Sequence, residues 1–188
     1  MIRKFFSFFL FSIILLSWCG CAQDRISRTY PCRFVLYVQY HNPCKALTAV
    51  TTLGYPVKVS VYKNSNGSYR VAMTDQNGNT ENQTITTQLE TYAYSSGIYL
   101  GASNGIIICE NSYDANPVAY DAQCPNCIDK YGSLGCPLSW STKSMQVKCS
   151  KCNRVYDLNT GSILSGDDGD RLLEYGVTYD GNRLYVGN

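Results

Sequence analysis

Histidine is nearly absent from this chain, which has one, His41, among 188 residues. Catalysis by a serine or cysteine nucleophile with histidine requires an imidazole that is held beside the nucleophile. His41 is followed by Asn42 and Pro43 and is far in sequence from every close pair of cysteines. The shortage argues against hydrolases of these kinds, and we expect His41 to be solvated or hydrogen-bonded rather than catalytic.

Clusters of lysine and arginine are also missing. The whole chain has a formal net charge of +2, and 14 basic and 14 acidic side chains remain once residues 1–20 are left out. Nucleic-acid binding needs a concentrated positive surface, because contacts to phosphates must displace condensed counterions. We therefore expect no nucleic-acid partner.

The sequence has no apolar run long enough to cross a bilayer comfortably. Residues 5–18 are mostly apolar and follow two basic residues, which is typical of a signal peptide. Gly20 then precedes Cys21, as a small residue precedes the lipidated cysteine of a lipoprotein signal. We predict a signal peptide over residues 1–20 with lipidation at Cys21, and ordinary cleavage after Ala22 is the alternative.

These features predict a protein of the bacterial cell envelope that is attached to the membrane through its lipid. We expect an outer-membrane lipoprotein that faces the periplasm or the cell surface. Residues 21–30 are expected to form a tether, and residues 31–188 a single domain. A domain of this length buries a core without help from a metal or a disulfide.

Sustained helical periodicity is missing too, and short runs of β-forming residues recur between turn signals, which predicts an all-β sandwich or barrel. Two hairpins are expected, one with its turn at Asn64–Gly67 and one at Asp180-Gly181. One short helix is predicted over residues 44–50, with Asn42 as its cap. The expected strands cover residues 34–40, 57–63, 68–73, 98–100, 105–109, 118–121, 154–158, 173–179 and 182–186.

Cysteine, in contrast, is abundant, and four of the cysteines form two CxxC pairs. Cys124 and Cys127 are separated from Cys149 and Cys152 by 21 residues, a spacing that can bring four sulfurs into a tetrahedron. Four thiolates favour zinc or iron, but outside the cytoplasm such pairs are also commonly disulfides. Three hypotheses therefore stand: a structural metal, disulfides, or a redox-active iron or iron–sulfur centre. The pairing of Cys32, Cys44, Cys109 and Cys136 is left open.

The residues around these pairs follow a known order. Residues 156–161 read YDLNTG and are followed by YGV at 175–177 and by Gly181. Together with the runs at 105–108 and 118–121, they make the stretch up to Val186 resemble a Rieske domain. In that all-β family the cluster lies at the tip of two loops, one with a Cys-x-His box and one with a Cys-x-x-His box.

Carried over to this chain, the resemblance matches Cys124 and Cys149 to the two cysteine ligands, whereas Asn126 and Cys152 stand where the histidines belong. A Rieske [2Fe–2S] centre needs two imidazoles on one iron, which a chain with one histidine cannot provide. The resemblance thus implies a Rieske-like antiparallel sandwich or barrel with exchanged ligands. Cys127 completes a four-cysteine site of the zinc-ribbon or rubredoxin kind, within loops at about residues 120–161.

The hypothesis for function follows from this site. A closed site of four thiolates leaves no open position for a substrate, so we expect no enzyme but a structural zinc in a binding or assembly component with an unidentified protein partner. The alternative is an electron-transfer protein with iron or an all-cysteine [2Fe–2S] cluster. A disulfide-stapled interaction domain without metal is the third hypothesis.

Overall fold

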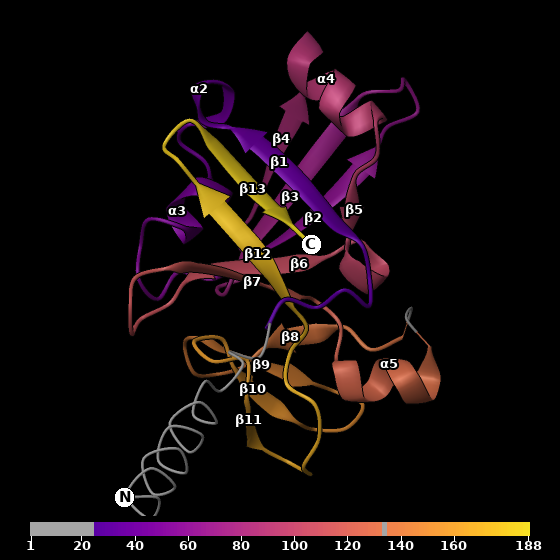
Figure 1. Cartoon of the computed structure of the whole chain (residues 1–188), viewed down its shortest axis with the longest axis vertical. Coiled ribbons are helices and arrows are strands. Elements are labelled where there is room, and N and C mark those ends of the chain that lie inside the picture. Colours follow the sequence, from indigo (N-terminus) through magenta and orange to yellow (C-terminus); the bar gives the residue numbers. More distant parts are fainter. Residues whose placement is uncertain (1–24, 133–134) are drawn as a thin grey trace, which may run out of the picture.

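A computed structural model of the chain describes residues 25–132 and 135–188 (Figure 1). The predicted signal peptide and Cys21 lie outside the described residues. The described part is mostly β, with a large and a small antiparallel sheet, so the prediction of an all-β fold is confirmed. Within these residues no helix is both long and apolar enough to span a membrane.

The large sheet has nine strands and folds over on itself around the first hydrophobic core. Alternating valine, isoleucine and leucine residues of its strands supply this core, because successive side chains of a strand point to opposite faces. In order across the sheet the strands are β4 (Thr80–Ile85), β3 (Tyr69–Asp75), β2 (Val57–Lys63), β6 (Ile106–Glu110), β7 (Pro117–Asp121), β12 (Glu174–Tyr179), β13 (Arg183–Gly187), β1 (Cys32–Tyr37) and β5 (Tyr99–Leu100).

The small sheet lies at the lower end of the molecule in Figure 1, together with helix α5 (Pro125–Tyr131). Its strands are β11 (Ile163–Ser165), β10 (Val155–Asp157), β9 (Gln146–Cys149) and β8 (Leu138–Trp140). A second hydrophobic core lies here and includes Cys124, Cys127 and Cys149. The four-cysteine region is thus a small β unit with a core of its own.

Strands β6 and β7 separate the two cores. Ile106 and Ile108 of β6 belong to the first core, whereas Ile107 and Cys109 belong to the second. All four side chains are fully buried, as the unbroken apolar run of this strand requires. One hairpin therefore forms a wall of both cores.

A partly buried lysine also links the large sheet to the small β unit. Lys58 of β2 extends its Nζ to the carbonyl oxygen of Leu138 in β8, and the same Nζ lies 5.8 Å from the centroid of the Trp140 ring. Burial lowers the pKa of Lys58. The ammonium group thus connects the large sheet to the small one.

The helices are where the structure differs most from our expectations. The predicted helix at 44–50 exists as α3 (Lys45–Ala49), but its N-cap is Cys44, not Asn42. Asn42 instead closes α2 (Val38–His41) by donating its N–H to the carbonyl of Val38, and this helix cuts short the strand expected over residues 34–40. Helices α4 (Gln88–Ser95), α5 and the short 3-10 helix η1 (Gly101–Ser103) were not predicted.

Candidate metal centre

The four cysteines of the two CxxC pairs come together in the small unit. The Sγ atoms of Cys124 and Cys152 are 3.7 Å apart, as are those of Cys127 and Cys149, and all four lie within 4.8 Å of one another. A tetrahedral ion with metal–sulfur bonds of about 2.3 Å separates its sulfurs by about 3.8 Å. The group could therefore hold a metal ion, as the spacing of the two pairs predicts.

The first pair is positioned by the start of α5. Cys124 is the N-cap of this helix, and its carbonyl accepts hydrogen bonds from the N–H groups of Cys127 and Ile128. Pro125 occupies the first turn, where a missing N–H costs nothing. The turn brings the side chains of Cys124 and Cys127 to the same side, and both are buried.

The second pair is positioned by the turn between β9 and β10. The N–H of Cys149 donates to the carbonyl of Arg154, and the N–H of Asn153 donates to the carbonyl of Cys149. Asn153 has a φ of 59°, a left-handed conformation that favours glycine and that asparagine tolerates better than most residues. Asparagine therefore suits this turn, which closes behind the second pair.

A tyrosine and an asparagine support the sulfur of Cys124. The hydroxyl of the fully buried Tyr156 lies 3.2 Å from this sulfur, and Nδ2 of Asn126 donates to the same hydroxyl oxygen at 3.0 Å. Since Asn126 donates to the oxygen, the hydroxyl proton is free to point at the sulfur. Asn126 also exchanges two hydrogen bonds with the backbone of Asp170, and this fixes its amide.

The electrostatic environment of Cys152 differs from that of the other ligands. Burial acts to raise the pKa of Cys152, but hydrogen bonds from the backbone N–H and the guanidinium of Arg154, and from Cys127 and Cys124, together lower the pKa to about 6. Burial raises the pKa values of Cys124 and Cys127. Cys152, the only partly exposed member of the set, thus offers a thiolate to a metal more readily than Cys124 or Cys127.

The remaining described cysteines do not join the cluster. Cys32, Cys44, Cys109 and Cys136 are buried free thiols, and none of them belongs to the group of four sulfurs. Cys136 nevertheless helps to position the first pair through its backbone, because its carbonyl accepts a hydrogen bond of 2.8 Å from the N–H of Cys124.

His41 lies in α2, outside the small β unit, and is hydrogen-bonded, as expected. Its Nε2 is 2.8 Å from Oε1 of Glu90, and its Nδ1 is 3.4 Å from Oε1 of Gln83. His41 and Glu90 are both buried. The histidine therefore connects α2 to α4 through a buried hydrogen bond.

Sequence reasoning did not assign the supporting roles of Tyr156, Asn126 and Arg154. Tyr156 opens the YDLNTG motif and Asn126 lies inside the first CxxC pair, so both were visible in the sequence. The contact of Tyr156 with the sulfur of Cys124, and that of Asn126 with the Tyr156 hydroxyl, depend on how β10 lies against α5, which no local pattern reports.

No family model matches the chain, and no curated protein matches it. The four-cysteine cluster and the mostly β fold thus stand on the structure, and the likeness to Rieske domains rests on the motifs.

Proposed function

We propose that this chain is a lipid-anchored protein of the cell envelope, with a Rieske-like fold, in which Cys124, Cys127, Cys149 and Cys152 hold one structural zinc ion. The observation that carries the proposal is the mutual distance of the four sulfurs, all within 4.8 Å. Four thiolates around one ion fill every position of a tetrahedral site. With no place for a substrate at the metal, the proposed role is that of a binding or assembly component.

The size of the cluster favours a single ion over an iron–sulfur cluster. A [2Fe–2S] centre divides its four protein ligands between two irons, so ligands on different irons are farther apart than ligands on one iron. Here all four sulfurs, including those that are not in the two closest contacts, lie within 4.8 Å of one another. Such mutual closeness is expected of four ligands around one ion.

A structural role fits what the four residues connect. Cys124 and Cys127 lie at the start of α5, and Cys149 and Cys152 flank the turn that leads from β9 to β10. One ion would tie these segments together, and in small zinc sites the binding free energy, of about 10–16 kcal/mol, is also folding free energy.

The proposed relation to Rieske domains is supported by the order of the motifs on the strands. The hairpin of β6 and β7 leads directly to Cys124, and β10 with its turn at Gly161 carries YDLNTG. The two histidine positions are occupied by Asn126 and Cys152, both at the cluster.

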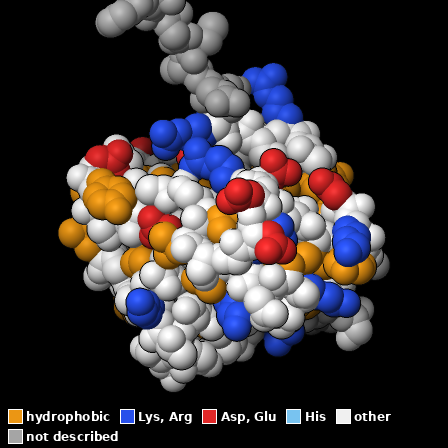
Figure 2. All heavy atoms as spheres, turned by 90° about the horizontal axis from the view of Figure 1, so that it is seen from below, with side chains coloured by type: hydrophobic (Ala, Val, Ile, Leu, Met, Phe, Trp, Pro, Cys, Tyr) orange, Lys and Arg blue, Asp and Glu red, His pale blue; other side chains and the backbone are white. Residues whose placement is uncertain are grey.

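Electron transfer by a single iron is the second candidate function, and one observation favours it. Cys152 is partly exposed, so a metal bound to it would lie close to the surface, where an electron could reach a partner. The face at this end of the molecule mixes basic and acidic side chains with small apolar patches (Figure 2).

Elemental analysis and a visible spectrum decide between these functions. The full-length protein is purified in detergent, without added metal and without chelator. About one zinc per chain and no visible band are expected. One iron per chain with visible absorption would instead establish the electron-transfer candidate. Neither metal, together with a loss of titratable thiols in the denatured, unreduced protein, would leave disulfides as the explanation.

The proposed anchor is tested separately. Cells that express the full-length protein are labelled with a radioactive fatty acid, and label is expected on the wild type and on a Cys19→Ala control. The Cys21→Ala variant is expected to carry none. Label on Cys21→Ala would contradict the proposed anchor.

A further inference from the structure

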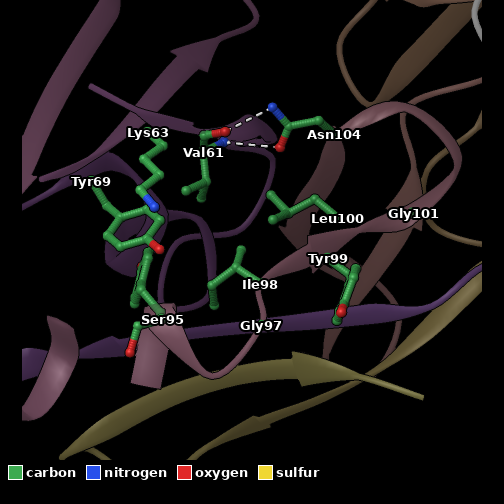
Figure 3. Close-up of a pocket in the computed structure, with 11 residues that line it drawn as sticks. Val61, Lys63, Tyr69, Ser95, Gly97, Ile98, Tyr99, Leu100, Gly101 and Asn104 are labelled. Carbon is green, nitrogen blue, oxygen red and sulfur yellow. Dashed lines mark hydrogen bonds between the residues drawn. The ribbon is translucent and has the colours of Figure 1, made fainter. Parts of the chain in front are cut away.

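A pocket of about 440 Å³ lies at the large sheet, and its lining shares no residue with the four-cysteine cluster (Figure 3). It is lined by residues from the ends of β2, β3 and α4 and from the segment 97–104. Pockets for small molecules in proteins have volumes of about 300–1,000 Å³. The volume is therefore sufficient for a small organic ligand.

One side of the pocket is a pair of aromatic rings, tilted against each other, with a cation beside the outer ring. Tyr94 is buried and donates its hydroxyl to the carbonyl of Val35, which fixes this ring. The Tyr69 ring lies against it, with 5.5 Å between the two centroids, and the Lys63 ammonium lies 5.8 Å from the Tyr69 centroid. The ammonium is thus held beside an aromatic face.

The side chains of Val61, Ile98 and Leu100 point toward the middle of the pocket and make its floor apolar (Figure 3). Together with the two tyrosine rings they offer an apolar surface of the kind on which the body of a small molecule packs. Such pockets usually add a few polar groups that fix the orientation of the ligand.

The opposite side is a loop in an unusual backbone conformation. Gly97, Gly101 and Asn104 all have positive φ values, of 117°, 68° and 50°. The Asn104 side chain bonds both the N–H and the carbonyl of Val61, and so takes the place of a neighbouring strand beside β2. Asparagine in this conformation costs free energy, and such residues cluster at ligand sites. The loop therefore forms a wall of the pocket that its own hydrogen bonds hold in place.

The charge in this pocket is of one sign. Lys63 is the only charged side chain among the lining residues. Among the ion pairs of the described residues, none includes Lys63. A ligand with a negative group would supply the missing partner, through a charge-assisted hydrogen bond.

We infer that this pocket binds a small organic carboxylate with an apolar ring, its carboxylate at Lys63 and its ring on the apolar floor beside Tyr69. The site is independent of the proposed metal function, because it shares no residue with the cluster.

The test is a titration of the full-length protein in nonionic detergent, followed by NMR of methyl-labelled isoleucine and valine. The probes are phenylacetate and cyclohexanecarboxylate, and phenylacetamide is the neutral counterpart of the first. We expect phenylacetate to shift the Ile98 and Val61 methyl signals and to bind up to about fivefold more tightly than the amide, as one exposed charge pair allows.

Two variants locate the site. Lys63→Gln removes the charge at an exposed position and is expected to abolish the preference for phenylacetate over phenylacetamide. Lys143→Gln changes an exposed lysine outside the pocket and is expected to keep that preference. Tyr69→Leu is expected to weaken both probes.

The inference is overturned if neither carboxylate shifts the Ile98 and Val61 signals at millimolar concentration. It is equally overturned if phenylacetate and its amide bind alike to the wild type, or if Lys63→Gln retains the preference. None of these outcomes bears on the metal analysis, so this inference and the proposed function fail separately.

Discussion

Replacing Tyr156 with phenylalanine tests whether the polar contacts around the cluster support a metal. The substitution removes one hydroxyl and keeps the buried ring, so the second core remains filled. The lost contact is the one at 3.2 Å to the sulfur of Cys124. Asn126 loses an acceptor at 3.0 Å but retains the carbonyl of Asp170 at 2.7 Å.

The expected magnitude follows from the charge on the sulfur. A metal-bound thiolate only accepts hydrogen bonds, and a hydrogen bond to a charged group contributes about 1.5–3 kcal/mol. Removing such a partner of a ligand commonly weakens metal binding by about 10- to 100-fold. We therefore expect Tyr156→Phe to bind zinc about 10- to 100-fold more weakly than the wild type.

The assay is a competition for zinc between the protein and a chromophoric chelator at fixed pH. Tyr175→Phe is the matched control, because Tyr175 is also a buried tyrosine with a hydroxyl bonded to a polar side chain, here Asp121 at 2.8 Å. Its zinc affinity should stay at the wild-type value. Equal affinities of Tyr156→Phe and the wild type, or an equal loss in both variants, would refute the reasoning.

Three further predictions concern the metal, a turn and the histidine. Cys149→Ser should release the metal and lower the thermal midpoint, whereas Cys109→Ser should keep the metal; full occupancy in the first variant would remove Cys149 from the site. Asn153→Ala should cost about 1 kcal/mol of unfolding free energy in denaturant titration, and Asn153→Gly should cost less, because φ is 59°; the reverse order would contradict this. The hydrogen bond to Glu90 raises the pKa of His41 above 6.5. The stabilisation of the folded state by protonated His41 is therefore fully present below about pH 6.5 and is lost as the pH rises through the folded pKa. The unfolding free energy of the wild type should therefore exceed that of His41→Gln by more at about pH 6 than at about pH 9. A difference that does not change with pH would contradict this explanation.

The hairpins and the cysteine cluster could be predicted because their signals are local. Strands β2 and β3 alternate apolar and polar residues on either side of an Asn-Gly turn, and β12 and β13 meet at Asp180-Gly181. The two CxxC pairs have a spacing that one ion can bridge. In each case the residues that matter lie next to one another or at a recognised spacing.

The missed elements carry weaker or different signals. Strand β4 is almost entirely polar, because it is the edge of the large sheet and only Ile85 is fully buried, so no apolar alternation marks it. Helix α4 also lacks a clear apolar stripe. Its start was nevertheless visible as the Thr-x-x-Glu sequence of a capping box. In the structure the Thr87 hydroxyl accepts from the N–H of Glu90 and donates to the Glu90 carboxylate.

The pocket and the contacts around Cys124 are of another kind. The wall at 97–104 faces Lys63 and Tyr69 only because the chain returns to β2 after α4. Tyr156 reaches Cys124 across 32 positions of sequence. Such contacts depend on tertiary packing, which single-sequence patterns do not report.

The shared hairpin of β6 and β7 has a consequence for how the molecule unfolds. Ile106 and Ile108 face the first core, and Ile107 and Cys109 face the second. If the second core unfolds, only one face of this hairpin becomes exposed to solvent. The remaining strands of the large sheet keep their own partners. Denaturation is then expected to proceed in two stages, with amide exchange in β8–β11 becoming fast while β1 and β13 stay protected.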